Sequence, residues 1–201
     1  MCTGKCSRCI AVTLYPLALI SIICNIVLFF PDGDIKYAQD GHITEEVKYM
    51  GGLVGGGLLV LLPALYINLT GKQGCCGNRC GMFLSIAFAA VGVAGALYSL
   101  SVAAVGLQNG PLCKVVLIWG TPFKTRESLK VLVTLHLSDS SYLTDDSTWW
   151  QCTEPKNIVQ FNIGLFATLV VTSSLEAILC AIQMINGLFG CLCGACVDKG
   201  G

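Results

Sequence analysis

Cysteine is the residue type whose number and spacing could support the most chemistry in this sequence. Nine of the 13 cysteines fall in three short clusters. The clusters are Cys2, Cys6 and Cys9; Cys75, Cys76 and Cys80; and Cys191, Cys193 and Cys196. Two of them contain the Cys-x-x-Cys spacing found among zinc ligands. Cysteines beside a membrane-spanning segment are instead substrates for S-acylation, so the meaning of the clusters depends on where the membrane lies.

One acidic residue, Glu176, lies deep inside a long apolar segment. A charged carboxylate is costly in hydrocarbon, and residues of this kind normally face the interior of a helix bundle. Side chains lean toward the N-terminus of their own helix, so Asn25 and Tyr98 on two other apolar segments could reach it. The favoured interpretation is a structural contact made by a protonated Glu176. A site for a lipid or sterol hydroxyl group and a path for protons or ions are the alternatives.

The remaining polar residues form no recognisable catalytic constellation. His42 and His136 are isolated, and the acids Asp139, Asp145 and Asp146 are typical of a solvated turn. The sequence also has no glycine-rich loop for binding phosphate. We therefore expect a protein that is not an enzyme and has no cofactor. Zinc at the cysteine clusters is the one metal alternative.

The composition indicates a membrane protein. Apolar residues make up 54% of the 201 residues and charged residues 12%, against about 45–50% and about 25% in a soluble domain. Four apolar segments, residues 10–30, 50–69, 82–107 and 163–186, approach the ~20 residues that cross a hydrocarbon core of ~30 Å. We predict an all-α membrane protein, a bundle of four transmembrane helices. The 12 basic and 12 acidic residues cancel, which argues against a nucleic-acid partner.

Basic residues indicate the orientation of the bundle. Four spans place the two ends of the chain and the segment between the second and third spans on the same side of the membrane. These segments contain five basic residues: Lys5, Arg8, Lys72, Arg79 and Lys199. Because short cytoplasmic loops carry an excess of Lys and Arg, we predict that residues 1–9, 70–81 and 187–201 are cytoplasmic. Residues 31–49 then form a small extracellular loop and residues 108–162 a large one. All three cysteine clusters lie at the cytoplasmic edge of the membrane, which favours S-acylation. No histidine is present there, which argues against zinc.

Cys113 and Cys152 are the only cysteines in the predicted extracellular loops. The outer face of a cell is oxidising, so we predict a disulfide bond that closes the large loop. In the chain-entropy model this closure contributes about 4 kcal/mol. Cys24 and Cys180 lie inside the predicted spans, where cysteine serves as a small apolar packing residue.

Small residues are concentrated in the second and third spans. The second begins with Gly51, Gly52, Gly55, Gly56 and Gly57, which contain the small-xxx-small pattern that lets helices approach closely. We interpret these glycines as contacts within one bundle. A face for forming a homo-oligomer is the alternative.

Several motifs resemble those of the transmembrane four L six family, most closely its fourth and fifth members. They include Cys2-Thr3-Gly4-Lys5-Cys6, Cys75-Cys76-Gly77-Asn78-Arg79-Cys80, Trp149-x-x-Cys152-x-Glu154-Pro155 and Leu175-Glu176-x-x-Leu179-Cys180. The resemblance implies a tetraspanin-like protein of the plasma membrane or of endolysosomal membranes. It also implies lateral association with integrins, growth-factor receptors and tetraspanins in acylated microdomains, with effects on adhesion, migration and growth.

Two functions are consistent with these features. The first is the non-enzymatic membrane organiser that the resemblance implies. The second is a sensor of a lipid, sterol or small metabolite that uses an intramembrane cavity near Glu176. One segment, residues 129–141, has the alternating pattern of a strand and departs from the family, so a partner surface inferred from relatives is not transferred to it.

Overall fold

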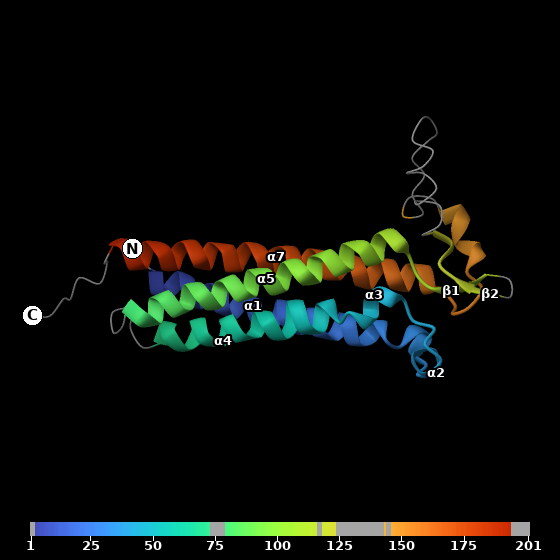
Figure 1. The fold of residues 1–201 in the computed structure, drawn as a ribbon, viewed down its shortest axis with the longest axis horizontal. Coiled ribbons are helices and arrows are strands. Elements are labelled where there is room, and N and C mark those ends of the chain that lie inside the picture. The colour runs from blue at the N-terminus through green and yellow to red at the C-terminus, as the bar shows by residue number, and fades with distance from the viewer. Residues whose placement is uncertain (1–2, 73–78, 116–117, 124–142, 144–145, 194–201) are drawn as a thin grey trace, which may run out of the picture.

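The computed structural model describes residues 3–72, 79–115, 118–123, 143 and 146–193. Four long helical segments run side by side (Figure 1). They are α1 (Thr3–Leu28), a π-helix η2 (Gly51–Leu58) that continues into α4 (Leu59–Lys72), α5 (Arg79–Asn109) and α7 (Ile158–Cys193). All four contain apolar stretches long enough to cross a membrane: Cys6–Leu28, Gly51–Leu69, Phe83–Asn109 and Ile158–Phe189. The predicted four-span helical architecture is therefore confirmed.

The helices pack with the seven-residue repeat of a left-handed bundle. Buried positions recur at alternating intervals of four and three, which keeps one seam facing the neighbouring helices. On α7 these positions are Asn162, Phe166, Leu169, Ser173, Glu176, Cys180, Gln183 and Gly187, and on α5 they are Ser85, Ala89, Gly92, Ala96, Ser99, Ala103 and Gly106. Both α1 and α5 pack against α4 and α7, so the order around the bundle is α1, α4, α5, α7.

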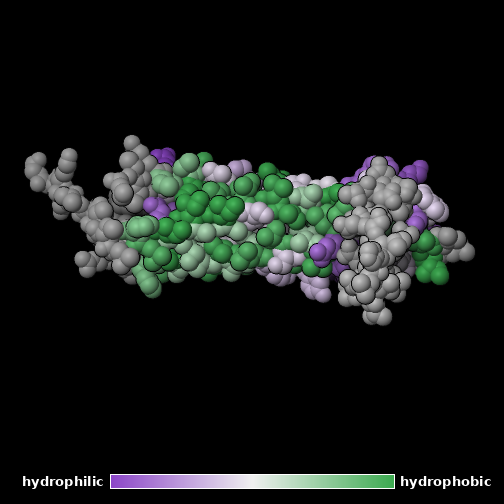
Figure 2. All heavy atoms as spheres, turned by 90° about the horizontal axis from the view of Figure 1, so that it is seen from above, coloured by the Kyte–Doolittle hydropathy of each residue, from purple (hydrophilic) through white to green (hydrophobic). Residues whose placement is uncertain are grey.

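The outward faces of the helices are apolar. Exposed side chains such as Leu19, Leu62, Leu97 and Ile178 point away from the bundle. Figure 2 shows hydrophobic residues over most of the helical part of the face in view. In a membrane these side chains contact lipid, so their exposure is expected and costs nothing there.

Shorter elements gather at one end of the bundle, opposite the end where α1 begins and α7 ends (Figure 1). Between α1 and η2 lie η1 (Pro31–Gly33), α2 (Lys36–Gln39) and α3 (Glu45–Lys48). Between α5 and α7 lie the strands β1 (Cys113–Val115) and β2 (Ile118–Gly120) and the 3-10 helix η3 (Asp146–Gln151). We call the described parts of the two loops, residues 29–50 and 110–157, the head.

The head differs from the sequence expectation in two respects. Strands β1 and β2 form an antiparallel hairpin in which Cys113 pairs with Gly120, and strands of three residues are too short to show a periodic pattern. Helix α7 begins at Ile158, before the predicted span, because Ile158 and Val159 are buried against Cys113 and Phe123 in the head. The strand predicted for residues 129–141 lies outside the described residues.

Candidate functional site

A layer of hydroxyl groups surrounds the carboxyl group of Glu176 inside the bundle. Glu176 is 0% exposed. The hydroxyl of Ser21 on α1 lies 3.2 Å from Glu176 Oε1 and 3.0 Å from Thr172 Oγ1. Thr172 Oγ1 also lies 3.0 Å from the carbonyl oxygen of Thr168 in its own helix. The contact between α1 and α7 is thus polar at this depth and is formed by short side chains.

The hydrogen bonds of this layer are compatible with a protonated carboxyl group. Ser21 has one hydroxyl proton, which it can donate to Thr172 or to Glu176 but not to both. If Ser21 donates to Thr172, a protonated Glu176 can donate to Ser21, and each of the three groups then takes part in a hydrogen bond. A neutral acid is also the form that hydrocarbon surroundings favour.

The partners predicted for Glu176 were wrong. Asn25 Oδ1 accepts a hydrogen bond of 3.0 Å from the backbone N–H of Leu53, and the Tyr98 hydroxyl donates over 2.8 Å to the carbonyl oxygen of Tyr49. Asn25 lies one helical turn beyond Ser21, so its amide reaches the first turn of η2, where backbone N–H groups lack helical partners. Tyr98 is 42% exposed, and its hydroxyl reaches the end of the small loop.

Glycines in η2 make room for this layer. A Cβ atom on Gly56 would lie 3.1 Å from Glu176 Oε2 and 3.0 Å from Ser21 Cβ, and one on Gly52 would lie 2.8 Å from the Ser21 carbonyl oxygen. On the other side of η2, a Cβ atom on Gly55 would lie 2.5 Å from the Gly95 carbonyl oxygen. These glycines are used in contacts within the bundle, as the first interpretation of the small-residue pattern expects.

Further hydrogen bonds join the helices along the length of the bundle. The donor and acceptor of each lie on different helices: Ser173 to Ser99 (2.7 Å), Gln183 to Ser85 (3.2 Å), Asn186 to Ser7 (3.0 Å) and Asn68 to Tyr15 (3.3 Å). Hydrogen bonds between transmembrane helices contribute modestly, about 0.6 kcal/mol each on average. Because these bonds are distributed along the bundle, they favour one rotation of each helix about its own axis relative to the adjacent helices.

Substitution of Glu176 distinguishes a structural contact from a charged site. Glu176→Gln retains a donor and an acceptor and should leave the melting temperature in detergent nearly unchanged. Glu176→Leu should cost about 1 kcal/mol, because Ser21 loses one partner but keeps Thr172. Ser21→Ala should be non-additive with Glu176→Leu, with a coupling of at least about 0.5 kcal/mol.

The Glu176→Gln result is the critical one. If this variant is as unstable as Glu176→Leu, the charge itself is required, and an ion-coupled role replaces the structural one.

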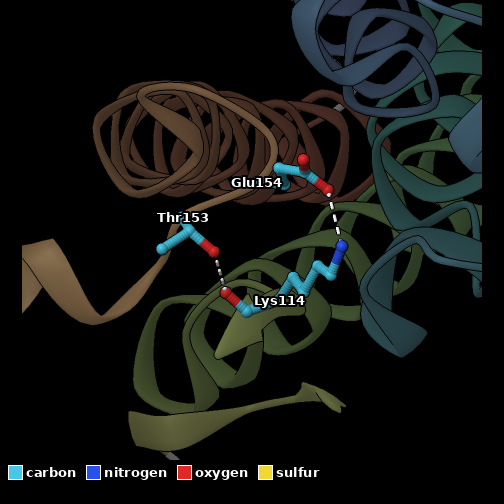
Figure 3. A network of polar contacts seen from close by, with 3 residues as sticks. All are labelled: Lys114, Thr153 and Glu154. Carbon is cyan, nitrogen blue, oxygen red and sulfur yellow. Dashed lines mark hydrogen bonds and ion pairs between the residues drawn. The ribbon is translucent and has the colours of Figure 1, made fainter. Parts of the chain in front are cut away.

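The head is closed by the predicted disulfide. Cys113 and Cys152 are bonded, with Cα atoms 5.4 Å apart and a sequence separation of 39 residues. Beside the bond, the Lys114 ammonium group pairs with Glu154 at 3.2 Å, and the Thr153 hydroxyl donates over 2.8 Å to the Lys114 carbonyl oxygen (Figure 3). The backbone N–H groups of Lys114 and Thr153 also bond across the two segments, each at 3.0 Å. The ends of the large loop are thus tied together covalently and by hydrogen bonds.

The small loop is attached to the large loop by aromatic contacts. The His42 ring stacks on Trp119 with centroids 4.0 Å apart, and Tyr37 contacts Trp119 edge-on at 6.0 Å. Sequence reasoning treated His42 as isolated, because the pairing joins two loops that are far apart in the chain. The two loops of the head therefore form one packed unit.

Tyr37 lies in an acidic part of the head. Partial burial raises the pKa of its hydroxyl above the ordinary 10.0, the carboxylates of Glu154, Asp32 and Asp34 raise it further, and the Lys114 ammonium group opposes them. The folded head therefore holds the proton of this phenol more tightly than the unfolded chain does. The resulting stabilisation is complete below about pH 10 and is lost as pH rises through the higher pKa of the folded state.

An alkaline titration should detect this effect. The absorbance change of the Tyr37 hydroxyl is the difference between the ultraviolet titrations of the parent and of Tyr37→Phe. Its midpoint should lie above the ordinary value of 10.0. Glu154→Gln should shift that midpoint to lower pH, because it removes a negative charge and leaves Lys114 without its carboxylate partner. A Tyr37 midpoint at or below the ordinary value would contradict the described position of this side chain.

The cysteine clusters are described only in part. Cys6 and Cys9 carry free, exposed thiols at the start of α1, while Cys24 and Cys180 are free and buried. Four further candidates, Cys2, Cys75, Cys76 and Cys196, lie outside the described residues. Cys80, Cys191 and Cys193 lie at helix ends where only the backbone is described. S-acylation of the nine therefore stays a prediction.

A four-helix bundle of membrane-spanning length, with a disulfide-closed loop between its third and fourth long helices, defines a multi-pass membrane protein of tetraspanin-like architecture. Residues 1–197 match the family model "L6 membrane protein", and the chain belongs to this family. No solved structure matches the chain.

Named relatives cover nearly the whole chain. It is 45% identical to human transmembrane 4 L6 family member 1 (98% of this chain, 96% of the relative). Rat member 4 is 43% identical (98% and 94%) and human member 5 is 39% identical (99% and 98%). The family resemblance seen in the motifs is confirmed, and member 1 is as similar as members 4 and 5.

Proposed function

We propose that this protein is a non-enzymatic organiser of the membrane that associates laterally with integrins, growth-factor receptors and tetraspanins. Through these associations it influences adhesion, migration and growth, at the plasma membrane or in endolysosomal membranes. The observation that carries the proposal is the distribution of polar groups. Hydrogen bonds between helices occupy polar side chains at several depths, and the outward faces are apolar. Such a bundle offers partners its lipid-facing surface and its head.

The orientation and the acylated rim are part of the same proposal. We place both termini in the cytoplasm, so that the head is extracellular or luminal. The exposed thiols of Cys6 and Cys9 lie at the opposite end and are accessible to an acyltransferase. A protein with four spans needs no additional anchor, so acyl chains here would tune its partition among membrane domains and its contact with partners.

Serine substitution of all nine candidate cysteines tests the rim. Acyl exchange should detect modification of the parent protein and lose it in the variant, and co-isolation of receptors in mild detergent should fall several-fold. The melting temperature should be unchanged. Cys24→Ala serves as the control, because this thiol is buried, and it should keep both acylation and co-isolation. Absence of acyl exchange in the parent would reject S-acylation and favour zinc.

One observation supports the second candidate function, a sensor of a lipid, sterol or small metabolite. Glu176 Oε2 is buried without a hydrogen-bond partner in the structure, so a ligand hydroxyl group could satisfy it. Lipid mass spectrometry of purified Glu176→Leu and Glu176→Gln tests this function. Loss of a bound sterol or lipid from Glu176→Leu, with folding intact, would support the sensor. The same bound lipids in both variants would reject it.

A further inference from the structure

The head contains a cavity of about 230 Å³ between its two loops. The small loop contributes Glu45, Glu46 and Lys48 to its wall, and the end of α5 and the segment after β2 contribute Asn109 and Thr121. Cavities for drug-sized ligands are larger, about 300–1,000 Å³. The size therefore suits a small polar group rather than a large ligand.

The cavity lies at the level where the membrane-spanning segments end. Lys48 is three residues before Gly51, where the second span begins, and Asn109 is the last residue of the third span. At this depth the hydrocarbon core of a bilayer gives way to the headgroup region. The small polar groups most abundant at this level are the headgroups of the leaflet that faces the head.

The charges in the cavity wall are of both signs. Glu46 is 7% exposed, and its carboxylate accepts a hydrogen bond from the Asn109 amide. Glu45 and Lys48 are exposed, and neither forms an ion pair with another described residue. Carboxylates bind an ammonium group and a lysine binds a phosphate through charge-assisted hydrogen bonds. The arrangement is thus complementary to a zwitterion that carries an ammonium group and a phosphate.

The type of ammonium group follows from the residues in the wall. Quaternary ammonium groups such as choline are recognised by cages of aromatic rings, and none of the described residues that line the cavity is aromatic. A primary ammonium group has three N–H donors. Glu45, Glu46 and the Thr121 hydroxyl provide oxygen acceptors on both loops.

We propose that this cavity binds a phosphoethanolamine group, with the ammonium group at Glu45 and Glu46 and the phosphate at Lys48. The group can belong to phosphatidylethanolamine in the adjacent leaflet or to soluble phosphoethanolamine. Binding bridges the small and large loops, since Thr121 and the carboxylates come from different loops. The site is separate from Glu176 and from the cysteine rim, and its existence does not depend on the proposed organiser function.

Lipid retention by the purified full chain tests the proposal. The protein is placed in bilayers containing equal amounts of phosphatidylethanolamine and phosphatidylcholine, and the retained lipids are measured by mass spectrometry after repurification. The wild-type chain should retain phosphatidylethanolamine in about ten-fold excess over phosphatidylcholine. Glu45→Gln should reduce this excess by about ten-fold, to near parity, because it removes one charge-assisted contact with the ammonium group, in which the two lipids differ. Lys48→Gln should instead lower the total amount of both retained phospholipids by about ten-fold, because the phosphate is common to them.

Matched controls lie in the same loop. Asp40→Asn and Lys36→Gln remove the same charges from exposed positions outside the cavity wall and should retain both the excess and the total amount of bound phospholipid. Soluble phosphoethanolamine distinguishes the two sources: displacement of the lipid at millimolar concentration shows that the headgroup suffices, and no displacement shows that the intact lipid is the ligand. Equal retention of both lipids by the wild-type chain would overturn the proposal. So would an equal loss of the excess in the two control variants.

Discussion

A Cys113→Ser variant is expected to lose about 4 kcal/mol of unfolding free energy. The reason is that the disulfide no longer restricts the conformations of the unfolded chain between two cysteines 39 residues apart. The bond also lies inside a hydrophobic cluster with Phe123, Ile158 and Val159, so its loss should loosen the contact between the head and α7. We expect retention of the variant in the endoplasmic reticulum and loss of surface protein, measured by surface biotinylation.

Cys6→Ser is the appropriate control, because this thiol is free and exposed. It should reach the surface as the parent does. Normal surface expression of Cys113→Ser, together with a Cys152 that does not react with thiol reagents, would show that the pairing is not the one that stabilises the head.

Gly55→Ala is the second substitution for which we expect a large effect. The new Cβ atom would lie 2.5 Å from the Gly95 carbonyl oxygen and 3.0 Å from the Ser99 backbone nitrogen. Both neighbours are backbone atoms, so the clash can be relieved only by moving η2 away from α5. Overpacking of this kind costs about 1–3 kcal/mol, which should appear as a lower melting temperature in detergent.

Gly164 provides a matched control in another span. A Cβ atom at this position on α7 meets no atom within 4 Å, so Gly164→Ala introduces no clash. Alanine also favours a helix over glycine by about 0.5–1 kcal/mol. Gly164→Ala should therefore melt at or slightly above the parent temperature. Equal destabilisation by the two substitutions would show that the close contact of Gly55 with Gly95 is not the cause.

The features that sequence reasoning predicted are those that depend on composition over long stretches or on compartment. Four apolar segments of membrane length predict four spans, whichever side of each helix contacts the other helices. Cys113 and Cys152 predict a disulfide because they are the only cysteines outside the spans on one side of the membrane. Neither inference requires knowledge of which residues touch.

Contacts between helices could not be read in the same way. In a soluble bundle the hydrophobic face of a helix marks its buried side, but lipid is as apolar as the bundle interior. The sequence therefore gave little sign that Ser21 rather than Asn25 faces Glu176. The seam on α7 mixes Phe166 and Leu169 with Ser173 and Glu176, and only its seven-residue spacing, not its hydropathy, distinguishes it. The pairing of His42 with Trp119 joins two loops and has no local signal.

The claim on which the proposed function most depends is that the head and the cysteine rim lie on opposite sides of the membrane. A membrane-impermeant maleimide applied to intact cells tests it directly. The wild-type chain should not be labelled, because Cys113 and Cys152 are bonded to each other, whereas Ile35→Cys, at an exposed position in the head, should be. The cluster Cys75, Cys76 and Cys80 should react only after permeabilisation and removal of thioesters. Labelling of this cluster in intact cells, or failure of Ile35→Cys to react there, would contradict the account.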